Sequence, residues 1–154
     1  IRAECDRLSG EASPLKVKPA PSYPVYQTQS PTTAQGRLLV PLSNPQTTDA
    51  LLRLAAAIAQ QHHYDLECLH IIPIPRHSRP SETSVDITAS RQMMEHAVAG
   101  GQTWQVPVHS QIRVAQDIAS AILETIRDRH IDLVLMGWEG VTLTPGRIFG
   151  TVVD

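Results

Sequence analysis

The stretch MGWEGVTLTPGRIFGT, residues 136–151, is the part of the sequence that most strongly indicates the fold. It follows a short apolar run, Ile131–Met136, that is typical of a buried strand. Glycines and a threonine then recur in the spacing G-x2-G-x9-G-T, at Gly137, Gly140, Gly150 and Thr151. Glycine lets a ligand approach the backbone closely, and free N–H groups at the start of a helix donate to anions. The pattern predicts a phosphate-binding loop between a strand and a helix; the alternative is a glycine-rich turn without a ligand.

Three pairs of strand and helix are predicted before this loop. Apolar runs at residues 38–42, 66–74 and 106–114 indicate the strands. Strands that alternate with helices form a parallel sheet with helices on both faces. Ligands bind such sheets at the carboxyl ends of the strands, where the strand order reverses. If the first and fourth strands are neighbours, the glycine loop therefore meets the turn at Pro41–Ser43.

The first helix is predicted to begin at Thr47 or Thr48, either of which can act as the N-cap, and to end near residues 61–63. Apolar residues recur along it with the period of an amphipathic helix. The stripe expected to face the sheet consists of Leu51, Leu54, Ala55 and Ile58.

The second helix is predicted over Val85–Ala99, with Ser84 as its cap and the pair Gly100-Gly101 as its stop. The third is predicted over Ile118–Arg129, with Asp117 as its cap.

Residues 1–36 differ from the rest of the chain because they lack apolar periodicity and carry many prolines, interleaved with Ser, Thr and Gln. We expect an extended, poorly packed linker over 1–36 and one folded domain over 37–154. The prolines of this segment are Pro14, Pro19, Pro21, Pro24 and Pro31.

Composition and missing motifs argue against several classes of function. The 154 residues carry a net charge of −2 and no basic field of the kind that binds nucleic acid. The two cysteines, Cys5 in the leader and Cys68 in a predicted strand, indicate a reducing compartment rather than a disulfide scaffold. The histidines lack metal-ligand spacing, and neither a G-x-S-x-G elbow nor a G-x4-G-K-[ST] loop is present. These absences argue against hydrolase and P-loop chemistry.

Over residues 37–154 the segments LLVPL, LECLHII, RVAQDIASAIL, DLVLMG and GRIFGT resemble, in order and spacing, the universal stress protein family. The resemblance implies an open parallel sheet of the five-stranded type, like that of adenine-nucleotide hydrolases, truncated here before its last strand. That strand commonly mediates dimerisation in the family, so a homodimer is expected of the complete domain. Without it, the edge of the fourth strand at Leu133–Leu135 needs another cover.

The resemblance also implies a nucleotide site. Pro41, Leu42 and Ser43 would line the ribose and adenine, Ile71 would pack on the base, and Met136 with Gly137 would close the pocket. Phosphate contacts would come from Gly140, Gly150, Thr151 and Val152.

Three positions depart from the family pattern. Ser43 stands where the nucleotide-binding branch usually has aspartate, and Gln116 stands where a glycine is common before the third helix. Glu139 adds a negative charge to the loop, which Arg147 could neutralise or which could help to hold a divalent metal such as Mg²⁺ with the phosphates. The preferred interpretation is that Glu139 is simply exposed to solvent.

The resulting hypothesis is a regulatory domain that binds ATP, AMP or a related ligand without turning it over. Resemblance to family members fused to membrane transporters or channels implies a cytoplasmic domain covalently linked to such a protein. The first alternative is an interaction module that kept the fold and lost the ligand, with Ser43 as the sign of loss. The second alternative is a slow ATPase.

Overall fold

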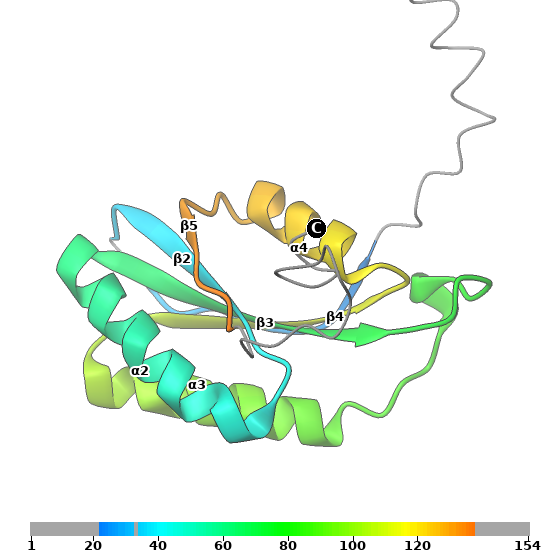
Figure 1. The fold of residues 1–154 in the computed structure, drawn as a ribbon, viewed down its shortest axis with the longest axis horizontal. Helices are drawn as coiled ribbons and strands as arrows, with labels where there is room; N and C mark the ends of the chain where they lie inside the picture. Colours follow the sequence, from blue (N-terminus) through cyan, green and yellow to red (C-terminus); the bar gives the residue numbers. More distant parts are fainter. Residues whose placement is uncertain (1–21, 33, 138–154) are drawn as a thin grey trace, which may run out of the picture.

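The computed structural model describes residues 22–32 and 34–137. Its centre is a five-stranded sheet in the order β1-β4-β3-β2-β5. Strands β2 to β5 run parallel, and β1 pairs antiparallel with β4. Helices α2 and α3 cover one face and α4 covers the other (Figure 1). The prediction of a parallel α/β sheet with helices on both faces is confirmed.

The elements are, in chain order, β1 (Tyr23–Thr28), β2 (Gly36–Pro41), α2 (Pro45–His62), β3 (Tyr64–Pro73), the 3₁₀ turn η1 (Pro80–Glu82), α3 (Thr88–Trp104), β4 (Val108–Ala115), α4 (Ile118–Asp128) and β5 (Leu133–Val134). The described helices do not include one with the length and apolar character needed to cross a membrane.

The face beneath α2 and α3 holds the larger apolar cluster. Leu38, Leu52, Leu66 and Met94 are almost completely buried there. Removing a side chain of this size from water contributes about 1.5–3 kcal/mol to folding. This side of the sheet therefore supplies most of the apolar driving force in the described part of the chain.

The face beneath α4 combines a small apolar cluster with buried charges. Asp65 and Glu67 lie on β3, and His109 and Arg113 lie on β4, all at most 5% exposed. His109 Nε2 lies 2.8 Å from Asp65 Oδ2. The Nε of Arg129, which follows α4, donates to Glu67 Oε1 over 3.0 Å. Pairing offsets the desolvation cost of these charges.

The expected linker contains a strand. Tyr23–Thr28 form β1 along the outer edge of β4, with an irregularity in the register between Pro24 and Tyr26. The backbone of β1 is extended, as predicted, but the prediction that the segment packs poorly is wrong for residues 22–32. Residues 1–21 lie outside the described part, so the proposed domain boundary stays a prediction.

Polar side chains from distant parts of the chain hold β1 at both ends. The Glu124 carboxylate accepts from Ser22 N and Ser22 Oγ, the latter over 2.7 Å. At the other end, Ser30 N donates to His109 Nδ1 over 3.1 Å, and Thr32 Oγ1 donates to Asp65 Oδ1 over 2.6 Å. These contacts explain the docking of a segment that has no apolar periodicity.

Helix α2 begins earlier than predicted. Its N-cap is Asn44, whose Oδ1 accepts from Gln46 N over 2.9 Å, and Pro45 occupies the first turn. The predicted stripe is also rotated, because Leu54 is 52% exposed while Leu52, Ala56 and Ala59 are buried with Ala55. The predicted end near residues 61–63 is confirmed, since α2 ends at His62.

Helix α3 begins at Thr88 rather than Val85 and runs through both glycines to Trp104. Gln105, with φ of 54°, ends it in the left-handed conformation. A Cβ on Gly101 would lie 2.8 Å from the Val106 carbonyl oxygen and would collide with Val108. Gly101 therefore allows α3 to approach β4 closely, and the predicted glycine stop is wrong.

Candidate nucleotide site

The candidate site lies where β2 and β5, neighbouring parallel strands, end. Leu38 is in register with Leu133, and Leu39 with Val134. Leu135 N then donates to Leu39 O over 2.9 Å, which extends the pairing beyond β5. The crossover from β2 through α2 leads to β3 on one side of β2, whereas the crossover from β4 through α4 leads to β5 on its other side. The strand order reverses between β2 and β5, which makes this the switch point of the sheet.

The turn after β2 is held to β3 through Leu42. Leu42 N donates to Leu69 O over 2.7 Å, and Leu42 O lies 2.7 Å from His70 Nδ1. The Leu42 side chain is 3% exposed, whereas Ser43 is exposed. Asn44 follows as the cap of α2. Ser43 is thus an exposed residue between two fixed neighbours.

Two of the predicted apolar contacts share one cluster. Ile71 of β3 and Met136 after β5 are half-buried, and both pack with Leu39, Leu69 and Ile122 on the α4 side. Pro41, the last residue of β2, is also half-buried and in register with Leu69. The structure therefore brings Pro41, Ile71 and Met136 to the same end of the sheet.

Gly137 is exposed and lies beside α2. A Cβ added there would meet Leu51 Cδ2 of α2 at 3.8 Å, which is ordinary van der Waals contact with the described residues. The loop after β5 therefore passes the first half of α2, close to the turn that carries Ser43. The predicted phosphate contacts Gly140, Gly150, Thr151 and Val152 lie outside the described residues, as do Glu139 and Arg147.

Gln116, one of the departures from the family pattern, contacts the loop after β3. Its Nε2 donates to Ser78 O. Asp117 caps α4 as predicted, with Ser120 N donating to its Oδ2 over 3.2 Å. The hydrogen bond from the Ser120 side chain lowers the pKa of Asp117, and Arg76 of the same loop adds a smaller lowering.

Metal and thiol chemistry find little support in the described part of the chain. Residues 22–32 and 34–137 hold no group of three or more His, Cys, Asp or Glu side chains placed to bind a metal ion. Cys68 is fully buried in β3, as expected of a core residue. Burial, followed by the charge of Glu67, raises the pKa of Cys68 to about 12, so its thiol stays protonated and unreactive.

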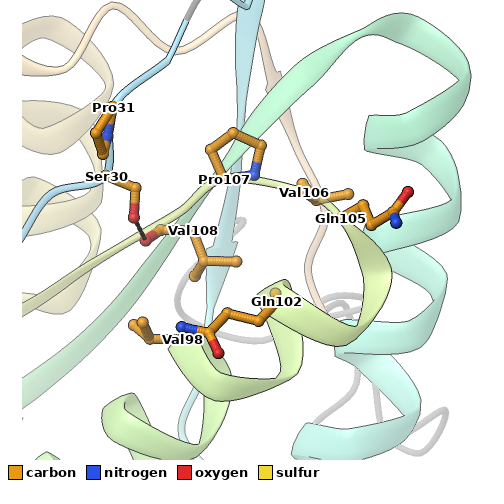
Figure 2. Close-up of a pocket in the computed structure, with 9 residues that line it drawn as sticks. Ser30, Pro31, Val98, Gln102, Gln105, Val106, Pro107 and Val108 are labelled. Carbon is orange, nitrogen blue, oxygen red and sulfur yellow. Dashed lines mark hydrogen bonds between the residues drawn. The ribbon is translucent and has the colours of Figure 1, made fainter.

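A cavity of about 260 Å³ lies at the opposite end of the sheet. Ser30 and Pro31, the end of α3 and the beginning of β4 line it, and Ser30 Oγ donates to Val108 O across its rim (Figure 2). Gln102 and Gln105 supply its uncharged polar groups. Because none of the predicted site residues lines it, this cavity is separate from the candidate site.

Two residues that shape the turn were missed as contributors to the site. Asn44 had a readable signal, since asparagine before proline is typical of an N-cap followed by the first helical residue. His70 was set aside with the other histidines because they lack metal-ligand spacing. Its hydrogen-bond partner is 28 positions away in the chain, so no local pattern reveals the contact.

Comparison with known proteins adds the family context. A family model described as the universal stress protein family matches residues 36–154. The Na(+)/H(+) antiporter NhaS5 of Synechocystis sp. is 30% identical over 118 residues. The match covers 76% of this chain and 17% of the antiporter.

Solved structures show the same fold. A universal stress protein from Archaeoglobus fulgidus superposes with a TM-score of 0.60 at 17% identity, covering 76% of this chain and 86% of that protein. A universal stress protein from the same organism in complex with dAMP gives 0.55 at 14% identity, covering 68% and 82%. A family member from Burkholderia pseudomallei gives 0.54 at 19%, covering 70% and 84%.

Proposed function

Because the chain belongs to the universal stress protein family, we propose that it binds an adenine nucleotide where β2 and β5 end and acts as a regulatory domain. The observation that carries this proposal is that the Pro41–Ser43 turn and the segment Met136–Gly137 follow two paired parallel strands, β2 and β5, at the switch point of the sheet. A structural neighbour in complex with dAMP supports an adenine nucleotide as the ligand class.

In this proposal each part of the site meets a different part of the nucleotide. Ile71 and Met136 offer apolar surface to the base, and the exposed turn at Ser43 offers hydrogen bonds to the nucleoside. The phosphates extend past Gly137 toward Gly140 and Gly150, with Thr151 and Val152 at the start of the following helix. A Mg²⁺ ion would accompany a triphosphate through the phosphate oxygens.

The nucleotide acts as a signal rather than a substrate in this account. The hydroxyl and carboxylate that are hydrogen-bonded at this end of the sheet, those of Ser120 and Asp117, form the N-cap of α4, a role that capping explains without hydrolysis. A slow ATPase is therefore the weaker alternative.

The proposal that the domain is part of a larger membrane protein is based on the similarity to an antiporter. The chain is similar to a Na(+)/H(+) antiporter, and the match covers 17% of that protein. This similarity supports a domain that is covalently linked to a membrane transporter, on the cytoplasmic side of the transporter. A homodimer of the complete domain is proposed from the family resemblance. In such an arrangement the nucleotide would report the state of the cell to the transporter.

A second candidate is an interaction module without a ligand. Ser43 favours it, because a serine at an exposed turn supplies no charge to select a ribose or an amino group. The two candidates differ in whether purified protein binds nucleotide at all.

Calorimetry with ATP and with AMP tests the proposal. We expect saturable binding by the wild-type chain and loss of binding in Gly150→Val, because a branched side chain would block the approach of phosphate to the backbone. Gln102→Ala, at the cavity on the opposite end of the sheet, is the matched control and should bind as the wild type does. Binding unchanged in Gly150→Val would place the ligand elsewhere, and no binding by any form would favour the interaction module.

A further inference from the structure

His70 is the side chain that ties the proposed nucleotide-binding turn to the neighbouring strand. We propose that His70 is a positioning residue, which aims the backbone N–H of Ser43 at the nucleotide so that the turn binds the nucleoside through its main chain. This inference rests on the proposed function and gives the turn a backbone donor for the nucleoside at a position where the side chain, Ser43, carries no carboxylate.

The first step is the direction of the hydrogen bond. Leu42 O lies 2.7 Å from His70 Nδ1, and a carbonyl oxygen can only accept. The proton of this bond is therefore on Nδ1.

The second step is the number of constraints on Leu42. Its N–H donates to Leu69 O over 2.7 Å, and its side chain is 3% exposed within the apolar cluster beneath α2 and α3. The peptide unit before Leu42 is thus fixed by β3, and the peptide unit after it is fixed by His70. The residue has no freedom left to rotate either unit.

The third step is the planarity of the peptide bond. The described residues contain no cis peptide bond, so the Leu42 C=O and the Ser43 N–H point in opposite directions. Because His70 holds the carbonyl, the Ser43 N–H is held pointing away from the His70 ring. Ser43 is exposed, and no acceptor for this N–H is found among residues 22–32 and 34–137.

The fourth step is the position of the donor. Ser43 stands between the end of β2 and the cap of α2, at the end of the sheet where Ile71 and Met136 lie. A neutral N–H donor suits an acceptor of the nucleoside, either a ribose oxygen or a ring nitrogen of the base. A carboxylate at this position would instead accept from ribose hydroxyl or amino groups.

Substitutions at His70 test the inference because asparagine and leucine separate hydrogen bonding from bulk. The amide nitrogen of Asn reaches the position of Nδ1, whereas Leu fills space and donates nothing. Loss of one aimed hydrogen bond corresponds to about a fivefold to tenfold weaker affinity. We expect ATP binding to weaken by about that factor in His70→Leu and to return to within about threefold of the wild type in His70→Asn. His62→Leu, at the far end of α2, is the matched control.

A second readout needs no nucleotide. The ¹⁵N–¹H resonance of Ser43 should shift in ligand-free His70→Leu and return toward its wild-type position in His70→Asn, while thermal melts verify that each variant is folded. Equal ATP affinity in wild type and folded His70→Leu would overturn the inference, as would a Ser43 resonance unchanged by both substitutions. If the wild-type chain binds no nucleotide, the proposed function fails, and the Ser43 resonance still decides whether His70 fixes the turn.

Discussion

At the scale of single residues, a comparison of Gly101 with Gly137 distinguishes a glycine needed for packing from one needed for ligand binding. Gly101 is surrounded by the carbonyl of Val106 and the side chain of Val108, whereas the described atoms around Gly137 leave ordinary contact distance for a Cβ. A glycine that the fold requires should reveal itself through stability, and one that a ligand requires should reveal itself through affinity.

Alanine at each of these positions gives the first prediction. Gly101→Ala should lower the free energy of unfolding by about 1–3 kcal/mol, because the added methyl overpacks the contact between α3 and β4. Gly137→Ala should change it by less than about 0.5 kcal/mol. Urea unfolding followed by circular dichroism measures both changes. Equal destabilisation by the two substitutions would contradict the claim that packing requires glycine at position 101 and not at position 137.

The buried thiol of Cys68 gives the second prediction. Burial raises its pKa to about 12, so the unfolded chain, with an ordinary thiol pKa of about 8.5, releases its proton first as pH rises. In a Cys5→Ser background, Cys68 should react with a maleimide only as fast as the protein unfolds, and stability should fall as pH rises from about 9 toward 12. Fast labelling of the folded protein at neutral pH would contradict the burial.

At the scale of secondary-structure elements, β1 shows which forces can recruit a segment with no apolar period. Its ends are bonded to Glu124 and Arg113 on one side and to His109 and Asp65 on the other. These partners are 33 to 102 positions away from the residues of β1 and its connection. Polar contacts of this range are set by the tertiary fold rather than by local sequence.

Removing one of these contacts is the third prediction. Glu124→Ala should leave Arg113, whose side chain is 7% exposed, without its carboxylate and should lower the free energy of unfolding by about 1–3 kcal/mol. Glu95→Ala is the matched control, because its partner Arg91 is exposed and such helix pairs contribute about 0.3–0.5 kcal/mol. Hydrogen exchange should also speed up across Tyr23–Thr28 in Glu124→Ala alone. Unchanged protection of β1 would mean that the Ser22 end does not hold the strand.

The contrast between local sequence signals and contacts of distant residues explains which features the sequence could predict. The parallel strands and the cap at Asp117 follow from apolar runs, alternation and capping chemistry, all of which are local signals. The adjacency of the first and fourth predicted strands was only a condition of the site hypothesis, and the structure shows it in the pairing of β2 with β5. Helix α3 was placed wrongly because Gly101 serves a contact with β4 that its neighbours in sequence do not reveal. Of the candidate site, the Pro41–Ser43 turn and Ile71 were expected from a family pattern, while the contact of His70 with Leu42, in the turn after β2, joins residues 28 positions apart and has no local signal.

At the scale of the whole molecule, the two edges of the described sheet differ. The outer edge of β1 carries Pro24 and a register irregularity, both of which disfavour further strand pairing. β5 is two residues long and its Leu133 is 41% exposed. Association between chains is therefore expected at β5 rather than at β1.

A charge on the β5 edge gives the fourth prediction. Leu133→Lys should reduce concentration-dependent association, because a lysine on an edge strand opposes pairing with another strand. Leu123→Lys, on the 56% exposed position of α4, is the control and should leave association unchanged. Light scattering at matched concentrations measures both. Equal association in the two variants would show that the β5 edge is not the contact.

The central claim is that an adenine nucleotide binds where β2 and β5 end, and a ¹⁵N–¹H titration of the wild-type chain with ATP tests it most directly. We predict saturable shifts at Ser43, Ile71 and Gly137, because these residues lie at the carboxyl end of the sheet, where the strand order reverses between β2 and β5. The amides of Gln102 and Gln105, at the cavity on the opposite end, should stay in place. Shifts confined to those cavity residues, or spectra unchanged by ATP, would contradict the account.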